Sequence, residues 1–329
     1  MTKPVTAIAA LMLIEEGRLA LDEPVDRLMP ELANRRVLNR IDSALDDTVP
    51  AARPITVEDV LTFRLGLRAV MAAPDSYPIL REIAALGLMG FGMSDPASPH
   101  NPKAWARAPG SIPLMAQPGE QWLYTAGSNV LGVLVARASG QTLPDFFQDR
   151  IFEPLGMADT AFYAPSDKVG RLATYHHEAG RLVVWDPAEG GAWTRPPAFP
   201  AGDSGLVSTL GDFFAFSRML AHGGEAGGRW LLSPASIAAM TANHLTPKQC
   251  AGGRMILGPG RGWGSGVSVA LEDTSDGVPA GTYGWNGGFG TSWAVDPACD
   301  TTTILLTQTL FDSPDLPPIH RDLWRVAFD

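Results

Sequence analysis

Apolar residues near the start of the chain recur at helical rather than alternating spacing. Residues 4–16 form the first such segment, and alanines separate its larger apolar side chains, which are Val5, Ile8, Leu11, Met12 and Ile14. Pro4 suits the first turn of a helix, and Gly17 suits the position after its last turn. Because a helix that is apolar on nearly every side is normally central, we expect this segment in the core.

Further helices are predicted where apolar positions at helical spacing follow a capping residue. Thr56 and Asp59 have the spacing of a capping box, and Thr142 and Thr209 precede residues typical of a first helical turn. The region 18–200 is therefore expected to be mostly helical and loop-rich. The predicted helices cover residues 55–63, 77–86, 103–107, 128–140, 142–156, 208–224, 233–245 and 317–328.

The last quarter of the chain changes from helical to strand-like patterns. Four short segments rich in β-branched and aromatic residues are separated by tight turns, at 262–271, 281–288, 291–297 and 301–310. A hairpin is also predicted at 171–187, with its turn at Ala179 and Gly180. We expect residues 260–329 to hold an antiparallel sheet and a closing helix, and residues 1–329 to form a single α+β domain.

Composition and charge narrow the possible functions. The 329 residues are 45% hydrophobic, which is enough to bury a large core. The formal net charge is −10 and no run of Lys or Arg occurs, so binding to nucleic acid is not expected. No apolar run approaches the roughly 18 residues that span a bilayer, so no membrane span is predicted.

The few Cys and His residues carry no metal-binding pattern. Cys250 and Cys299 are the two cysteines, and the six histidines show no H-x-x-x-H spacing. Neither a metal nor another cofactor is expected. So low a cysteine content fits a reducing compartment, and a cytoplasmic location is the expectation.

A lysine stands in the first turn of the predicted core helix. Lys3 is unfavourable there, because the N-terminus of a helix favours anions. Its amine either extends to solvent or belongs to an S-x-x-K motif, in which a Ser hydroxyl lies beside the Lys because positions i and i+3 share a helix face. That Ser would stand directly before Met1, outside the printed sequence.

Two further segments are candidates for chemistry. Tyr124, on a loop before a predicted helix, is either a half-buried Tyr with a bonded hydroxyl or a general base beside a Lys. Gly287 and Gly288 belong either to a simple glycine-rich hairpin or to a turn along which a substrate lies, with the Gly288 N–H directed at an oxyanion. GDSG at 202–205 is interpreted as a structural turn, because the chain lacks the two β-barrels of trypsin-like proteases.

Together these segments resemble the serine β-lactamase and penicillin-binding protein family, in particular the esterase-like branch related to class C β-lactamases. The resemblance implies a β-lactamase/DD-peptidase-like fold, in which helices flank an antiparallel sheet and a further part is mostly helical. The matching segments occur in the family's order and cover nearly the whole chain; they are MTKPVTAIAALMLIEEGRLALDEPV, ITVEDVLTFRLGL, PGEQWLYTAGSNVLG, FEPLGMADTAF, GLVSTLGDFFAFSRML and GWNGGFGTSWAVDP.

The resemblance implies roles by position. Lys3 matches the Lys of S-x-x-K and Tyr124 the Tyr of the second motif, and Gly288 would supply one oxyanion-hole N–H. Strong β-lactamase activity is not expected, because the third motif here lacks the cation that grips a β-lactam carboxylate. That motif, K-T-G or H-x-G in β-lactamases, would contact substrate and is here Trp285, Asn286 and Gly287.

Family members also carry a Ser, a helix and two strands ahead of the segment that begins at Met1. The chain is therefore expected to be truncated just after the nucleophilic Ser, to lack those elements and to be inactive as printed. The parent function is expected to be that of a serine hydrolase, a carboxylesterase that acts on small acyl esters or amides through an acyl-enzyme. The alternatives are a DD-peptidase, a weak β-lactamase, an acyltransferase or a non-catalytic binding module.

Overall fold

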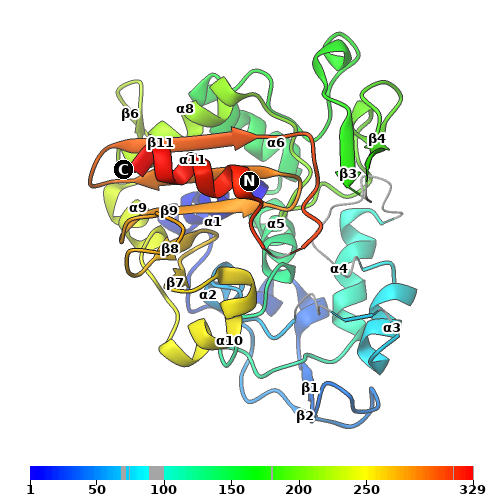
Figure 1. Ribbon diagram of the computed structural model, residues 1–329. Helices are drawn as coiled ribbons and strands as arrows, with labels where there is room; N and C mark the ends of the chain where they lie inside the picture. The colour runs from blue at the N-terminus through cyan, green and yellow to red at the C-terminus, as the bar shows by residue number, and fades with distance from the viewer. Residues whose placement is uncertain (68–71, 74, 89–99, 179–180, 314, 329) are drawn as a thin grey trace.

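The structure is a computed structural model that describes residues 1–67, 72–73, 75–88, 100–178, 181–313 and 315–328 (Figure 1). Its largest sheet is antiparallel and has the strand order β11-β10-β9-β8-β7. The strands are β7 (Arg261–Trp263), β8 (Ser268–Ala270), β9 (Tyr283–Gly287), β10 (Thr291–Asp296) and β11 (Thr301–Leu306). The four segments predicted as strands all lie in this sheet and follow one another as a meander. The segment predicted at 262–271 is not a single strand, because it holds most of β7, a turn and β8.

Helices lie on both faces of this sheet. Helix α11 (Pro318–Phe328) crosses the front in Figure 1, and α1 (Thr2–Glu15) lies behind. Helix α1 is buried from Thr2 to Leu13, as its apolar pattern predicts. It packs against α5 (Ala126–Ser139), which ends at the left-handed Gly140. The α+β expectation is thus met by a sheet between two layers of helix.

The other helices lie mostly where capping residues predict them. These are α2 (Val57–Leu61), α3 (Pro78–Ala85), α4 (Pro102–Ser111), α6 (Leu143–Phe147), α7 (Glu153–Leu155), α8 (Leu210–Ala221) and α9 (Pro234–Met240). A π-helical segment, Gln148–Phe152, joins α6 to α7, so the predicted continuous helix 142–156 has an irregular middle. Helix α10 (Pro247–Leu257) was not predicted, although Thr246 and Gln249 form its capping box.

Three small hairpins complete the described structure. The strands of the predicted hairpin are β3 (Tyr175–Glu178) and β4 (Leu182–Asp186), and its predicted turn at Ala179 and Gly180 lies outside the described residues. The other two hairpins pair β1 (Arg36–Leu38) with β2 (Thr48–Pro50) and β5 (Glu225–Ala226) with β6 (Arg229–Trp230). Within the ranges given above, no helix is both long and apolar enough to cross a bilayer.

Helix α2 begins with the predicted capping box. The Asp59 N–H donates to Thr56 Oγ1 (3.3 Å), and the Thr56 N–H donates to Asp59 Oδ2 (3.0 Å). We expect Thr56→Ala to lower the free energy of unfolding by about 1 kcal/mol, because the Asp59 N–H loses its acceptor. Urea titrations of Thr56→Ala and of the matched Thr56→Ser, which keeps the hydroxyl, measure this. Equal losses in the two variants would contradict it.

Helix α11 packs against β11 and contains a buried histidine, His320. The His320 ring contacts Phe311 edge-on, and its Nδ1 has no hydrogen-bond partner among the described residues. Burial lowers the pKa of the His320 imidazole. The unfolded chain therefore takes up a proton where the folded chain does not, so stability decreases as pH falls through the ordinary His pKa near 6.5.

We therefore expect the free energy of unfolding to fall less between pH 7.5 and pH 5.5 in His320→Leu than in the unchanged protein. Urea titrations at the two pH values measure this difference. The exposed Ile319 on the same helix supplies the control, since it does not titrate and Ile319→Ala should leave the pH dependence as it was. An identical pH dependence in His320→Leu would rule out His320 as a contributor.

Candidate active site

Lys3 lies in the first turn of α1 and is buried, with 4% of its surface exposed. Its Nζ donates a hydrogen bond to the main-chain oxygen of Asp203 (3.0 Å) and lies 5.0 Å from the centre of the Tyr124 ring. Among the described residues, no carboxylate lies within ion-pair distance of Lys3. The amine therefore does not extend to solvent, and within the described part of the chain it contacts the Asp203 carbonyl and the face of the Tyr124 ring.

Two features hold Tyr124 in place, namely the conformation of the next residue and a hydrogen bond from Trp285. Thr125, which follows it, has φ +86° and ψ −52° just before α5 begins. A non-glycine residue at positive φ is strained, so the turn that presents Tyr124 is maintained by its surroundings. In addition, Trp285 Nε1 donates to Tyr124 Oη (2.9 Å). A phenol that accepts this bond keeps its own O–H and a second lone pair for another partner.

Tyr124 sits in a box of aromatic side chains. The box contains the rings of Phe63, Trp122, Trp263 and Trp285, with centroids 5.3–6.5 Å from that of Tyr124. Phe63 follows Thr62, the C-cap of α2, and its main-chain oxygen accepts from the Leu123 N–H (2.7 Å). Such packing fixes the phenol as a rigid part of the site.

The turn between β9 and β10 forms the next part of the site. The Gly290 N–H donates to the Gly287 oxygen (2.9 Å), and the Phe311 N–H donates to the Gly288 oxygen (2.8 Å). Gly288 is exposed, and in the part of the chain that is described its N–H has no hydrogen-bond partner. A Cβ on Gly287 would lie 3.6 Å from the Met1 nitrogen, so this turn faces the start of α1.

Two of the predicted substrate-contact residues, Asn286 and Trp285, already have hydrogen-bond partners within the protein. The Asn286 Oδ1 accepts a hydrogen bond from Ser292 Oγ (2.8 Å), across the β9–β10 pair. Trp285 is buried and engaged with Tyr124. The structure thus brings Lys3, Tyr124 and Trp285 together and places the Gly287–Gly288 turn beside the start of α1. The substrate-binding role of Asn286 and the oxyanion role of Gly288 stay predictions.

The 202–206 turn, interpreted from sequence as structural only, holds the lysine. The Asp203 oxygen accepts from Lys3, and the Gly202 oxygen accepts from Thr6 Oγ1 (2.7 Å). On the opposite side, the Asp203 N–H donates to Asn129 Oδ1 (3.1 Å). A Cβ at Gly202 would come within 2.1 Å of the Ser128 oxygen, so only glycine fits against α5. No local pattern in the sequence connects this turn with Lys3, which is 200 residues away.

The start of α1 is shielded from water. Burial, with a smaller contribution from Lys3, lowers the pKa of the Met1 amino group to about 5, although Asp203 acts in the opposite direction. Electrostatic interactions are stronger in such a site than in water. In the described ranges, no group of three or more His, Cys, Asp or Glu side chains is placed to hold a metal ion.

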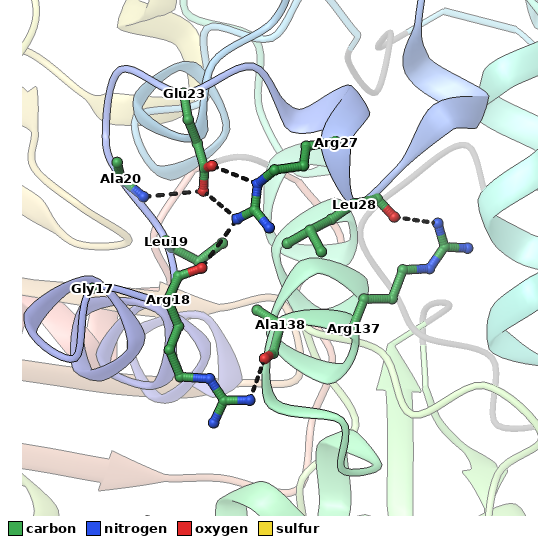
Figure 2. A pocket seen from close by; sticks show the side chains of 9 residues that line it. All are labelled: Gly17, Arg18, Leu19, Ala20, Glu23, Arg27, Leu28, Arg137 and Ala138. Atoms are coloured by element: carbon green, nitrogen blue, oxygen red, sulfur yellow. Dashed lines mark hydrogen bonds and ion pairs between the residues drawn. The ribbon is translucent and has the colours of Figure 1, made fainter.

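A cavity of about 580 Å³ lies at the other end of α1 and is distinct from this site (Figure 2). Three arginines line it, and each donates a hydrogen bond to a main-chain oxygen of the surrounding segments. Arg18 donates to the Ala138 oxygen in the last turn of α5 (2.5 Å), Arg27 to the Arg18 oxygen (3.1 Å), and Arg137 to the Leu28 oxygen (2.8 Å). Guanidinium groups bonded to carbonyls in this way stabilise the fold around the cavity.

A sequence profile of the Beta-lactamase family matches residues 1–327. The chain belongs to the β-lactamase family. Protein Rv1367c of Mycobacterium tuberculosis is 36% identical over 326 residues, which are 96% of this chain and 77% of that protein. Lovastatin esterase of Penicillium rubens is 33% identical over 317 residues, 90% of this chain and 74% of that enzyme.

A solved structure supports the same assignment. The structure of EstCE1, described as a hydrolase with promiscuous acyltransferase activity, matches with a TM-score of 0.79 and 27% identity. The match covers 98% of this chain and 83% of EstCE1. The predicted α+β, β-lactamase-like fold is therefore confirmed, and this β-lactamase-family chain is related to hydrolases and acyltransferases.

Proposed function

We propose that this β-lactamase-family protein is a carboxylesterase that cleaves small acyl esters through an acyl-enzyme. The observation that carries the proposal is the buried Lys3, 5.0 Å from the Tyr124 ring, with the Tyr124 hydroxyl held by Trp285. A buried amine without an acidic partner is costly to fold. Its placement against a phenol is explained if the two groups move protons.

The proposed nucleophile is a Ser directly before Met1, in the sequence Ser-Met-Thr-Lys. One helical turn then places its hydroxyl on the same face as Lys3. The Ser oxygen attacks the ester carbonyl while its proton passes to the Lys3–Tyr124 pair, which for this step carries one proton fewer, as a neutral amine beside the phenol or as an ammonium beside the phenolate. The alcohol leaves with that proton, which returns the pair to its starting form. Water then attacks the acyl-enzyme and releases the acid. The Gly288 N–H and the N–H of the Ser itself would hold the oxyanion.

Trp285 favours esters over β-lactams. In this position it supplies an indole N–H that is already bonded to Tyr124 and no positive charge for a β-lactam carboxylate. Relatives named as an esterase and as a hydrolase with acyltransferase activity are consistent with acyl transfer from simple esters. Acyl transfer to an alcohol in place of water is the second candidate, because the same acyl-enzyme serves both reactions.

The test compares two proteins that differ only in the residue directly before Met1, Ser in one and Ala in the other. The Ser protein is expected to hydrolyse p-nitrophenyl butyrate, to react slowly or not at all with nitrocefin, and to gain the mass of one fluorophosphonate adduct. The Ala protein and the chain as printed should do none of these. A folded Ser protein that neither reacts with fluorophosphonate nor hydrolyses the ester would refute the proposal.

A further inference from the structure

A second group of aromatic side chains lies beyond the Gly288 turn. It consists of four rings, whose neighbouring centroids are 5.5–5.8 Å apart in tilted or edge-on pairs. We call this group the aromatic wall; its members are Tyr175 on β3, Trp185 on β4, Trp193 in the 3-10 helix Ala192–Thr194, and Phe289 in the β9–β10 turn.

The aromatic wall adjoins the candidate active site at two points. Phe289 directly follows Gly288 and contacts each of the other three rings. Trp193 Nε1 donates to the Gly205 oxygen (3.0 Å), in the turn that also supplies the carbonyl partner of Lys3. A group bound at Gly288 and extending away from Lys3 therefore meets these rings.

The outer part of the wall is exposed and apolar. Trp185 is 37% exposed, and on the same strand Val184 is 53% and Leu182 63% exposed. An exposed indole is unfavourable in water unless something covers it. The hairpin that carries them is fixed to the end of the sheet, because the His176 N–H donates to the Gln308 oxygen (2.8 Å) and the Leu310 N–H donates to the His176 oxygen (2.9 Å).

The surroundings of the wall favour an uncharged partner. Asp186, the acidic neighbour of Trp185, accepts a hydrogen bond from the Ala192 N–H (2.8 Å) but keeps its negative charge, so the test below includes a cationic ester. Burial raises the pKa of the Tyr175 hydroxyl, which has no hydrogen-bond partner among the described residues. A cation could also rest on aromatic faces, but these rings direct edges and faces at one another and not into an open cage.

We propose that the aromatic wall is a binding subsite for a bulky, uncharged hydrocarbon group of the ester, held with its carbonyl at Gly288. This rests on the proposed function for the position of the carbonyl, whereas the subsite itself is defined by its rings. It predicts that the substrate class is apolar esters, and that Trp185 and Phe289 determine the preference among them.

Binding, and not hydrolysis, is the readout of the test, so that it does not depend on the nucleophile. The chain as printed is titrated by NMR with 3,3-dimethylbutyl butyrate and with choline butyrate, which have nearly the same shape but differ in charge. Methyl butyrate, which lacks the bulky group, is the third ligand. The neutral bulky ester is expected to bind at least about fivefold more tightly than either of the others.

Two variants locate the binding. Trp185→Ala should weaken binding of the neutral bulky ester at least about fivefold and leave methyl butyrate unchanged, and Phe289→Ala should act in the same direction. Trp230→Ala is the matched control, since Trp230 is 60% exposed on a different hairpin. Equal binding by Trp185→Ala and the unchanged chain, tighter binding of the choline ester, or no binding of the neutral ester up to its solubility limit would each overturn the proposal.

A result against the subsite is distinguishable from a result against the proposed function. If the Ser and Ala proteins hydrolyse p-nitrophenyl butyrate equally but Trp185→Ala loses binding, the wall holds and the nucleophile is wrong. If the Ser protein is an esterase and Trp185→Ala binds like the unchanged chain, the function holds and the wall is not its subsite.

Discussion

Lys3→Met is expected to lower kcat/KM for p-nitrophenyl butyrate by about a thousandfold, in the protein with Ser before Met1. General acid–base catalysis contributes typically 10²–10⁴-fold, and the Lys3 amine lies 5.0 Å from the centre of the Tyr124 ring. Met has nearly the same length and shape without the charge, so the helix face stays filled. Initial rates of nitrophenol release measure the effect.

The fold of Lys3→Met should be as stable as that of the parent protein, or more so. The buried ammonium has one carbonyl acceptor and an aromatic face in compensation for its lost hydration. The Met side chain has no charge and needs no hydrogen-bond partner, so the substitution should not lower the free energy of unfolding. Lys103→Met, on the exposed face of α4, is the matched control and should leave rate and stability unchanged. Activity that falls only in proportion to a loss of unfolding free energy would show that Lys3 is structural.

Features that depend on neighbouring residues were predictable from the sequence. The capping box of α2 requires only Thr56 and Asp59, three residues apart, and it forms as predicted. The burial of α1 follows from apolar side chains on nearly every side of one short segment. Helix α10 was missed although Thr246 and Gln249 give the same signal, because two adjacent glycines, Gly252 and Gly253, interrupt its apolar pattern.

Features that join distant segments were not predictable from local pattern. The bond from Lys3 to Asp203 links residues 200 apart, and that from Trp285 to Tyr124 links residues 161 apart. The resemblance to a family placed Lys3 and Tyr124 in one site, but it gave no reason for the GDSG turn. The close approach of Gly202 to the Ser128 oxygen, which holds that turn against α5, depends on the folded positions of both segments.

The aromatic wall illustrates the same limit. Tyr175, Trp185 and Trp193 come from a hairpin and the loop after it, whereas Phe289 comes from a turn about a hundred residues later. The sequence predicted the hairpin at 171–187 and the glycine-rich turn at Gly287 and Gly288 as two separate elements, with no contact between them. In the folded chain, hydrogen bonds between His176 and the chain after β11 help to bring the two together.

Tyr124→Phe is expected to lower kcat for p-nitrophenyl butyrate at least about a hundredfold in the protein with Ser before Met1, with little change in KM. The ring stays in its aromatic box, so substrate binding is preserved, while the O–H that shares the proton transfer with Lys3 is removed. Steady-state kinetics measure the two constants separately. Tyr77→Phe, at the start of α3, is the matched control and should not change either constant.

Trp285→Phe tests how much of the catalytic effect of Tyr124 depends on the hydrogen bond that orients its hydroxyl. Removing the indole N–H leaves the Tyr124 hydroxyl in place but without its donor, and we expect a smaller loss of about tenfold. If Trp285 acts only by orienting Tyr124, the double variant should be no slower than Tyr124→Phe alone, because the bond it would break is already gone. Additive losses in the double variant would mean that Trp285 contacts the substrate independently of Tyr124. An unchanged kcat in Tyr124→Phe would show that the phenol takes no part in the mechanism, and Lys3 alone would then be the proton acceptor.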